Sequence, residues 1–135
     1  MTENEIGREV VDAAVKIHRA LGPGLLESVY ELLLAHELAK RGLQVQRQMV
    51  VPIVYEGLRF DEAFRADLVV NGLVLIEIKS VEHLSNAHRK QVLTYLRLTG
   101  LKLGLLLNFS EALMKDGIER IVNHLEEPGA APSHG

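Results

Sequence analysis

The chain has 135 residues, of which 47% are hydrophobic and 24% are charged, the size and composition of one globular domain. It contains no cysteine, so disulfide bonds and thiolate metal sites are excluded. The net charge of −3 argues against a large basic surface for duplex nucleic acid. It argues less strongly against an enzyme whose bound metal supplies positive charge.

Targeting and membrane segments are not visible in the sequence. Residues 1–5 are acidic and lack the basic region followed by an apolar run that marks a secretory signal. No apolar stretch is long enough to span a membrane. We therefore expect a cytoplasmic protein without membrane contact, with a single domain over residues 1–125. Residues 126–135 have no apolar period and are predicted to be a disordered tail.

Two helices are predicted at the start of the chain. Apolar residues recur at helical spacing between residues 5 and 21, and Gly22-Pro23-Gly24 ends this helix. A second helix is expected over residues 25–41, which are rich in leucine, alanine, glutamate and lysine, and Gly42 is placed to end it.

Three strands follow the helices. Residues 43–55 and 58–70 alternate between polar and apolar residues, with a turn at Glu56-Gly57 between them. Asn71-Gly72 predicts a tight hairpin to a third strand over residues 73–79, because both turn residues tolerate positive φ.

Strand alternation also predicts which side chains share a face. In the first strand, Gln44, Gln46 and Gln48 are expected to face away from the apolar side. In the second strand, the apolar face is expected to hold Phe60, Phe64, Ala66, Leu68 and Val70.

The last third of the chain predicts a helix, a strand and a further helix. Ser85 is a good N-cap for a helix that runs to Leu98, and the apolar run over residues 101–109 indicates a strand buried on both faces. We expect a last helix over residues 117–125. The whole order predicts an α/β fold with a mixed central sheet flanked by helices, in which the last strand returns by a helical crossover.

Three charged residues, Asp67, Glu77 and Lys79, interrupt the predicted hairpin. Alternation places Glu77 and Lys79 on one face, with Ile76 and Ile78 on the other, and hairpin pairing can bring Asp67 beside Glu77. Two adjacent carboxylates repel unless a cation lies between them, and Mg²⁺ prefers such oxygen ligands. The alternative is a solvated sheet face on which Lys79 forms a salt bridge to one of the carboxylates.

The start of the second helix carries a motif. The segment Gly24-Leu-Leu-Glu27-Ser-Val-Tyr30 resembles the motif that gives the GxxExxY protein family its name. The resemblance implies that Glu27 reaches the metal centre and takes part in catalysis, that Tyr30 supports it, and that Gly24 serves the backbone geometry at the helix start. An exposed glutamate stabilised by the helix dipole is the alternative for Glu27.

The hairpin residues carry the second resemblance. Asp67 with Glu77-Ile78-Lys79 resembles the catalytic motif of the PD-(D/E)XK nuclease superfamily, to which the GxxExxY family is assigned, although Ala66 replaces the proline of that motif. The resemblance implies a restriction-endonuclease-like αβββαβ core over about residues 5–125. It implies metal ligation by both carboxylates and the Ile78 carbonyl. Lys79 would orient the attacking water and stabilise charge on the phosphate.

The helix after the hairpin carries Gln91-x-x-x-Tyr95, which matches a motif of the recombination-exonuclease branch of the superfamily. The match implies that Gln91 and Tyr95 help to hold the metal shell and the phosphate backbone. His88 shares their helix face and is a candidate phosphate contact. A solvated helix face is the alternative for all three.

These observations favour a nuclease that uses Mg²⁺, or Mn²⁺ as a substitute, to hydrolyse DNA or RNA through a metal-activated water. The rival is an inactive nuclease-like domain that binds nucleic acid or oligomerises, which the acidic balance and the lack of a basic arm or aromatic stacking surface support. We expect nucleic acid, DNA before RNA, as the partner. A domain of this size would need a homodimer to cut both strands at once.

Overall fold

A five-stranded sheet of order β1-β2-β3-β4-β5 is the frame of the protein, seen in a computed structural model that describes residues 1–126. The parallel pair is β3 with β4, and the other neighbours are antiparallel. The sheet is therefore mixed, as the sequence predicts. The strands are β1 (Val45–Tyr55), β2 (Leu58–Val70), β3 (Val74–Lys79), β4 (Leu103–Asn108) and β5 (Ile118–Val122).

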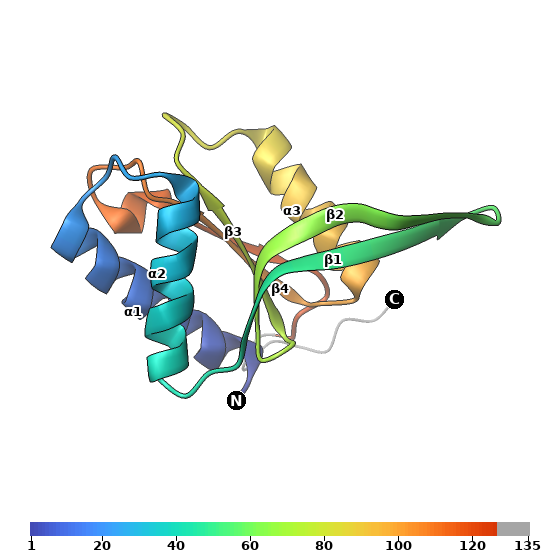
Figure 1. Ribbon diagram of the computed structural model, residues 1–135, viewed down its shortest axis with the longest axis horizontal. Coiled ribbons are helices and arrows are strands. Elements are labelled where there is room, and N and C mark those ends of the chain that lie inside the picture. Colours follow the sequence, from blue (N-terminus) through green and yellow to red (C-terminus); the bar gives the residue numbers. More distant parts are fainter. Residues whose placement is uncertain (127–135) are drawn as a thin grey trace.

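Helices cover both faces of the sheet (Figure 1). The first two, α1 (Glu3–Leu21) and α2 (Glu27–Lys40), pack on one face, and α3 (Asn86–Thr99) packs on the other and connects β3 to β4. Ser85 caps α3, as predicted, and its hydroxyl accepts a hydrogen bond from the His88 amide. The predicted αβββαβ core is present. None of the described helices is both long and apolar enough to cross a membrane.

The prediction of a last helix over residues 117–125 is wrong. A single 3₁₀ turn, η1 (Met114–Gly117), is followed by β5, which pairs antiparallel with β4. The apolar residues Ile118, Ile121 and Val122 fit a short helix and a short strand equally well by spacing, but all are β-branched and favour strands. Pairing with β4 decides between helix and strand, because without β5 the buried strand β4 would expose a row of unpaired backbone groups.

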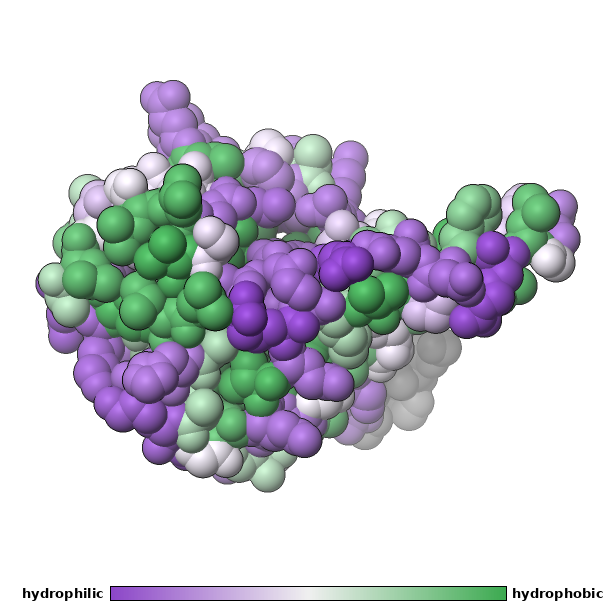
Figure 2. Space-filling model, viewed as in Figure 1, coloured by the Kyte–Doolittle hydropathy of each residue, from purple (hydrophilic) through white to green (hydrophobic). Residues whose placement is uncertain are grey.

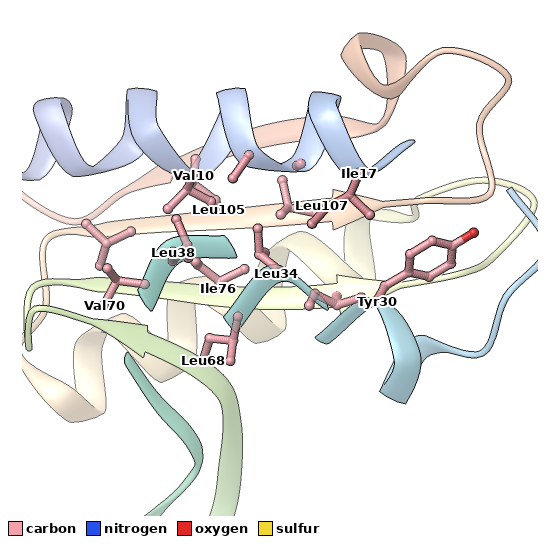
Figure 3. Close-up of a cluster of buried hydrophobic side chains, with 14 of the residues drawn as sticks. Val10, Ile17, Tyr30, Leu34, Leu38, Leu68, Val70, Ile76, Leu105 and Leu107 are labelled. Carbon is pink, nitrogen blue, oxygen red and sulfur yellow. The ribbon is translucent and has the colours of Figure 1, made fainter. Parts of the chain in front are cut away.

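Two hydrophobic clusters hold the layers together. The first fills the space between α1, α2 and the sheet, where Leu34 and Leu38 meet Ile76 and Leu105 (Figure 3). The second joins α3 to the opposite face through Val92 and other residues. Fully burying one such side chain contributes about 1.5–3 kcal/mol. The helix approaches so closely that a Cβ on Gly104 would lie 2.7 Å from Cγ1 of Val92.

The hairpin of β1 and β2 projects from the sandwich as a long arm (Figure 1). Leu68 and Val70 belong to the first hydrophobic cluster, whereas Phe64 and Ala66 belong to the second. The prediction that these residues share one face is therefore wrong. The strand changes sides at Asp67, which lies between the two pairs. β2 pairs with β3 only from Leu68 to Val70, so the part of β2 before Asp67 follows β1 in the arm instead of the central sheet.

The predicted disordered tail falls, beyond its first residue Glu126, outside the described part of the chain.

Candidate active site

The candidate site lies where the backbone ladder between β2 and β3 ends. That ladder runs from Val70↔Val74 to Leu68↔Ile76. At the next position of each strand, Asp67 and Glu77, side-chain carboxylates take the place of backbone carbonyls as hydrogen-bond acceptors. Oδ2 of Asp67 accepts a hydrogen bond from the Ile78 amide at 2.8 Å, and the Asp67 amide donates to Oε2 of Glu77 at 3.4 Å. The two carboxylates therefore occupy the fork at which the strands separate.

The environment of Glu77 penalises its charged form. The residue is only 4% exposed. Burial is the largest of the effects that together raise the pKa of Glu77 from 4.5 to about 9. The side-chain hydrogen bond and the negative charge of Asp67 act in the same direction, while the charge of Lys79 opposes the shift. Without a cation, Glu77 therefore carries a proton at neutral pH. A cation between the carboxylates can replace that proton.

Lys79 lies at the end of β3, half-buried and on the same side as Glu77. Among residues 1–126, no carboxylate forms an ion pair with it within 4.0 Å, so the salt bridge considered from the sequence is not formed. Its carbonyl accepts a hydrogen bond from the Phe109 amide at 3.0 Å. The buried Asn108 bonds both backbone groups of Val81. These contacts fix the backbone around Lys79 and leave its amine available.

The GxxExxY segment fixes Glu27 close to this strand end. The hydroxyl of Tyr30 donates to the Gly22 carbonyl at 2.5 Å and accepts from the Leu25 amide at 3.2 Å, while its ring stacks on Phe109. These bonds hold the loop before α2, in which Gly24 has a φ of +110° that disfavours any side chain. Glu27 then begins α2.

Glu27 bonds to the backbone beside Lys79 instead of joining the carboxylate pair. Its Oε2 accepts a hydrogen bond from the Ser80 amide at 2.8 Å. Within the described chain, no group of three or more histidine, aspartate or glutamate side chains is placed to hold a metal ion. The donor set that fits Mg²⁺ is therefore the pair Asp67 and Glu77, with water or backbone oxygens completing a shell that this ion accepts.

Of the three predicted residues on α3, the structure brings Tyr95 to the carboxylates. Burial raises the pKa of Tyr95, and the negative charges of Glu77 and Asp67 add to the shift. Its ring stacks on Phe64 with centroids 3.7 Å apart. Gln91 is exposed on the preceding turn.

His88 is engaged at the start of the helix, where its Nδ1 accepts a hydrogen bond from the Ser85 amide at 3.0 Å. Of these three α3 residues, Tyr95 is therefore the one whose pKa the negative charges of the carboxylate pair raise.

A cleft of about 440 Å³ opens beside Asp67, between α2 and β1. Figure 2 shows hydrophilic residues gathered along this boundary, next to an apolar area over α2. A larger groove of about 740 Å³ lies along α1, β4 and β5, but it contains none of the candidate site residues. The smaller cleft is lined by Glu27, Ser28, Glu31, Arg47, Gln48 and Asp67.

Sequence reasoning missed four residues of this cleft: Ser28, Glu31, Arg47 and Gln48. Glu31 is buried, and its carboxylate binds Arg47 at 2.9 Å and the Gln48 amide at 2.5 Å. Nε2 of Gln48 also lies 3.4 Å from Oδ1 of Asp67. A glutamate one helical turn after Glu27 was the available signal for Glu31, but no pattern in the sequence distinguishes Gln48 from its neighbours on the strand.

The sequence also matches the profile of a known protein superfamily. The profile of the PD-(D/E)XK nuclease superfamily matches residues 4–121. The chain belongs to this superfamily. The match runs from α1 into β5 and includes Asp67, Glu77 and Lys79, and the restriction-endonuclease-like fold predicted from the sequence is confirmed. No curated protein and no solved structure matches the chain.

The raised pKa of Glu77 predicts how stability of the metal-free protein depends on pH. Because the folded protein holds a proton that the unfolded chain releases above pH 4.5, the stabilising contribution of this proton is complete below 4.5 and is lost as the pH rises through about 9. Urea unfolding between pH 5 and 9 in EDTA should therefore show falling stability, and Glu77→Gln should flatten that dependence. Glu82→Gln, a change at an exposed carboxylate, is the control. An unchanged slope in Glu77→Gln would contradict the assignment.

Proposed function

We propose that this superfamily member is a nuclease that requires Mg²⁺, or Mn²⁺ as a substitute, and hydrolyses phosphodiester bonds of DNA, with RNA as the second candidate. The observation that carries the proposal is the carboxylate pair of Asp67 and Glu77 at the open end of the β2–β3 ladder. Placing the buried carboxyl group of Glu77 against the half-buried Asp67 is unfavourable unless a proton or a cation neutralises the charge. Membership of the superfamily supports the same reaction.

The side chains divide the work between them. Asp67 and Glu77 bind the cation, with the Ile78 carbonyl as a third candidate ligand. A bound Mg²⁺ supplies a Lewis acid for the phosphate and for the attacking water. The ammonium of Lys79 forms no ion pair with a carboxylate among residues 1–126, so it would be available to stabilise the charge that develops on the phosphate. Glu27 holds the Ser80 amide through one oxygen, and its other oxygen would be able to accept a hydrogen bond from a water bound to the cation.

Nucleic acid would approach across α3. The environment of Tyr95 keeps its phenol protonated, so its hydroxyl can donate a hydrogen bond to a phosphate oxygen. Gln91, which is exposed on the turn before Tyr95, is a second candidate contact to the phosphate backbone. His88, at the start of the helix, is a third. We further propose membership of the GxxExxY group, a cytoplasmic location and a homodimer that cuts both strands.

An inactive module that binds nucleic acid remains the rival function. The acidic net charge of −3 fits an inactive domain in general, but it gives one that must bind phosphate without a metal little general attraction for its ligand. The carboxylate of the half-buried Asp67, beside the buried Glu77, adds negative charge at the position where the nucleic-acid backbone would bind. Only a bound cation makes this position favourable for nucleic acid, and that is the arrangement of an enzyme.

The proposal predicts metal-dependent cleavage. Purified protein should degrade at least one member of a panel of single- and double-stranded DNA and RNA with Mg²⁺ or Mn²⁺, and EDTA should abolish the cleavage. Asp67→Asn and Glu77→Gln should remove activity without unfolding the protein, because each change removes one ligand and relieves repulsion.

Asp61→Asn, on the exposed arm, should retain full activity. Nucleic-acid binding without cleavage under every metal condition would favour the inactive module.

Lys79 and Glu27 should affect different kinetic quantities. Lys79→Ala should lower kcat by roughly 100-fold or more, with little change in substrate binding, because the ammonium acts on transition-state charge. Glu27→Gln should raise the Mg²⁺ concentration needed for the half-maximal rate, with activity partly restored at high metal. Lys102→Ala, an exposed lysine remote in sequence, is the control. Equal losses of binding and rate in both variants would contradict these separate roles.

A further inference from the structure

Gln48 adopts a backbone conformation that glutamine ordinarily avoids. Its φ is +52° in the middle of β1, in the left-handed region where a Cβ crowds the backbone. Its neighbours are paired with β2, Arg47 with Leu68 and Met49 with Ala66, but Gln48 itself has no partner in this register. The residue that it faces by position is Asp67. Strain of this kind persists only where the surrounding structure imposes it, and it often marks a functional site.

The strained backbone directs the side-chain amide between two carboxylates. Nε2 of Gln48 donates to Oε1 of Glu31 at 2.5 Å and lies 3.4 Å from Oδ1 of Asp67. Glu31 is an immobile anchor, because its side chain is only 6% exposed and Arg47 binds its other oxygen at 2.9 Å. The amide thus connects a fixed carboxylate to a candidate metal ligand.

Asp67 is thereby held at both oxygens by neutral donors. The Ile78 amide binds Oδ2 at 2.8 Å, and the Gln48 amide approaches Oδ1. Each carboxylate oxygen has a second lone pair, so these contacts fix the orientation of the group without using up its capacity to bind a cation. The amide also lies between Asp67 and the negative charge of Glu31.

We propose that Gln48, anchored by Glu31, is a positioning residue that holds Asp67 in its metal-binding orientation. The inference deepens the proposed function and rests on it where metal affinity is concerned. Its effect on Asp67 itself can be measured without any metal. A residue that orients a ligand in this way typically changes metal affinity by roughly 10–100-fold when it is lost.

The competing explanation is that the unusual backbone at Gln48 serves only the twist of the arm. The variant Gln48→Gly distinguishes the two explanations. Glycine adopts positive φ without strain, so the variant keeps the backbone conformation and removes only the side-chain amide. Gln46→Gly is the matched control. It removes the same side chain two residues earlier on the same strand, where Gln46 pairs with Val69 and makes no side-chain hydrogen bond within the described chain.

The first measurement is hydrogen exchange of the Ile78 amide by NMR in EDTA, since this amide donates to Asp67. In Gln48→Gly, exchange at Ile78 should become faster by about tenfold while the rest of β3 keeps its protection. In Gln46→Gly, exchange at Ile78 should stay at the wild-type rate. A wild-type rate at Ile78 in Gln48→Gly would overturn the inference, whatever the activity of the variant.

The second measurement is the affinity for Mn²⁺, determined by calorimetry. The Mg²⁺ concentration needed for half-maximal cleavage is measured in parallel. Gln48→Gly should weaken Mn²⁺ binding by roughly tenfold or more, with an unchanged or higher Tm, and an affinity equal to that of the wild type would overturn the inference. Wild-type protein that binds no metal, together with faster Ile78 exchange in Gln48→Gly, would instead overturn the proposed function and leave the action of Gln48 on Asp67 standing.

Discussion

The repulsion between the carboxylates of Asp67 and Glu77 is the constraint on which the rest of the site depends. Glu77 is buried beside a second acid, so its pKa rises to about 9 and the fold must accommodate a proton or a cation there. A protein selected only for stability would place an apolar pair at this point of a hairpin. In the proposed function, the unfavourable pair marks the position as functional and would give it affinity for a cation.

The surrounding structure holds this unfavourable pair in place. The ladder between β2 and β3 stops at Leu68 and Ile76, so the amides of Asp67 and Ile78 donate to the carboxylates instead of to carbonyls of the opposite strand. On the helical side, the hydroxyl of Tyr30 ties down the loop that presents Glu27. The sheet and the α2 layer therefore converge on the end of one strand, and each contributes a different kind of contact.

Local rules of the sequence were sufficient to predict the centre of the site. Asn71-Gly72 fixes the hairpin, and strand alternation then places Asp67 near Glu77 and on the side of Lys79. These relations involve residues close in sequence, so they need no knowledge of the tertiary structure. The same holds for the spacing of Glu27 and Tyr30 within one helix.

What the sequence did not predict depends on contacts between distant segments. The end of the chain forms β5 because the edge of β4 needs a partner, and the spacing of its apolar residues alone does not reveal this. Gln48 resembles Gln44 and Gln46 in the strand pattern, and no glycine marks its positive φ. Its role emerges only when Glu31 from α2 and Asp67 from β2 meet at its amide.

The central claim is that a cation replaces the proton on Glu77. Calorimetric titration of Mg²⁺ or Mn²⁺ at pH 7, repeated in buffers of different ionisation enthalpy, measures the protons released on binding. With the pKa of Glu77 at about 9, the account predicts release of about one proton per ion bound, and little release in Glu77→Gln. Binding without proton release, or no binding of either ion, would contradict it.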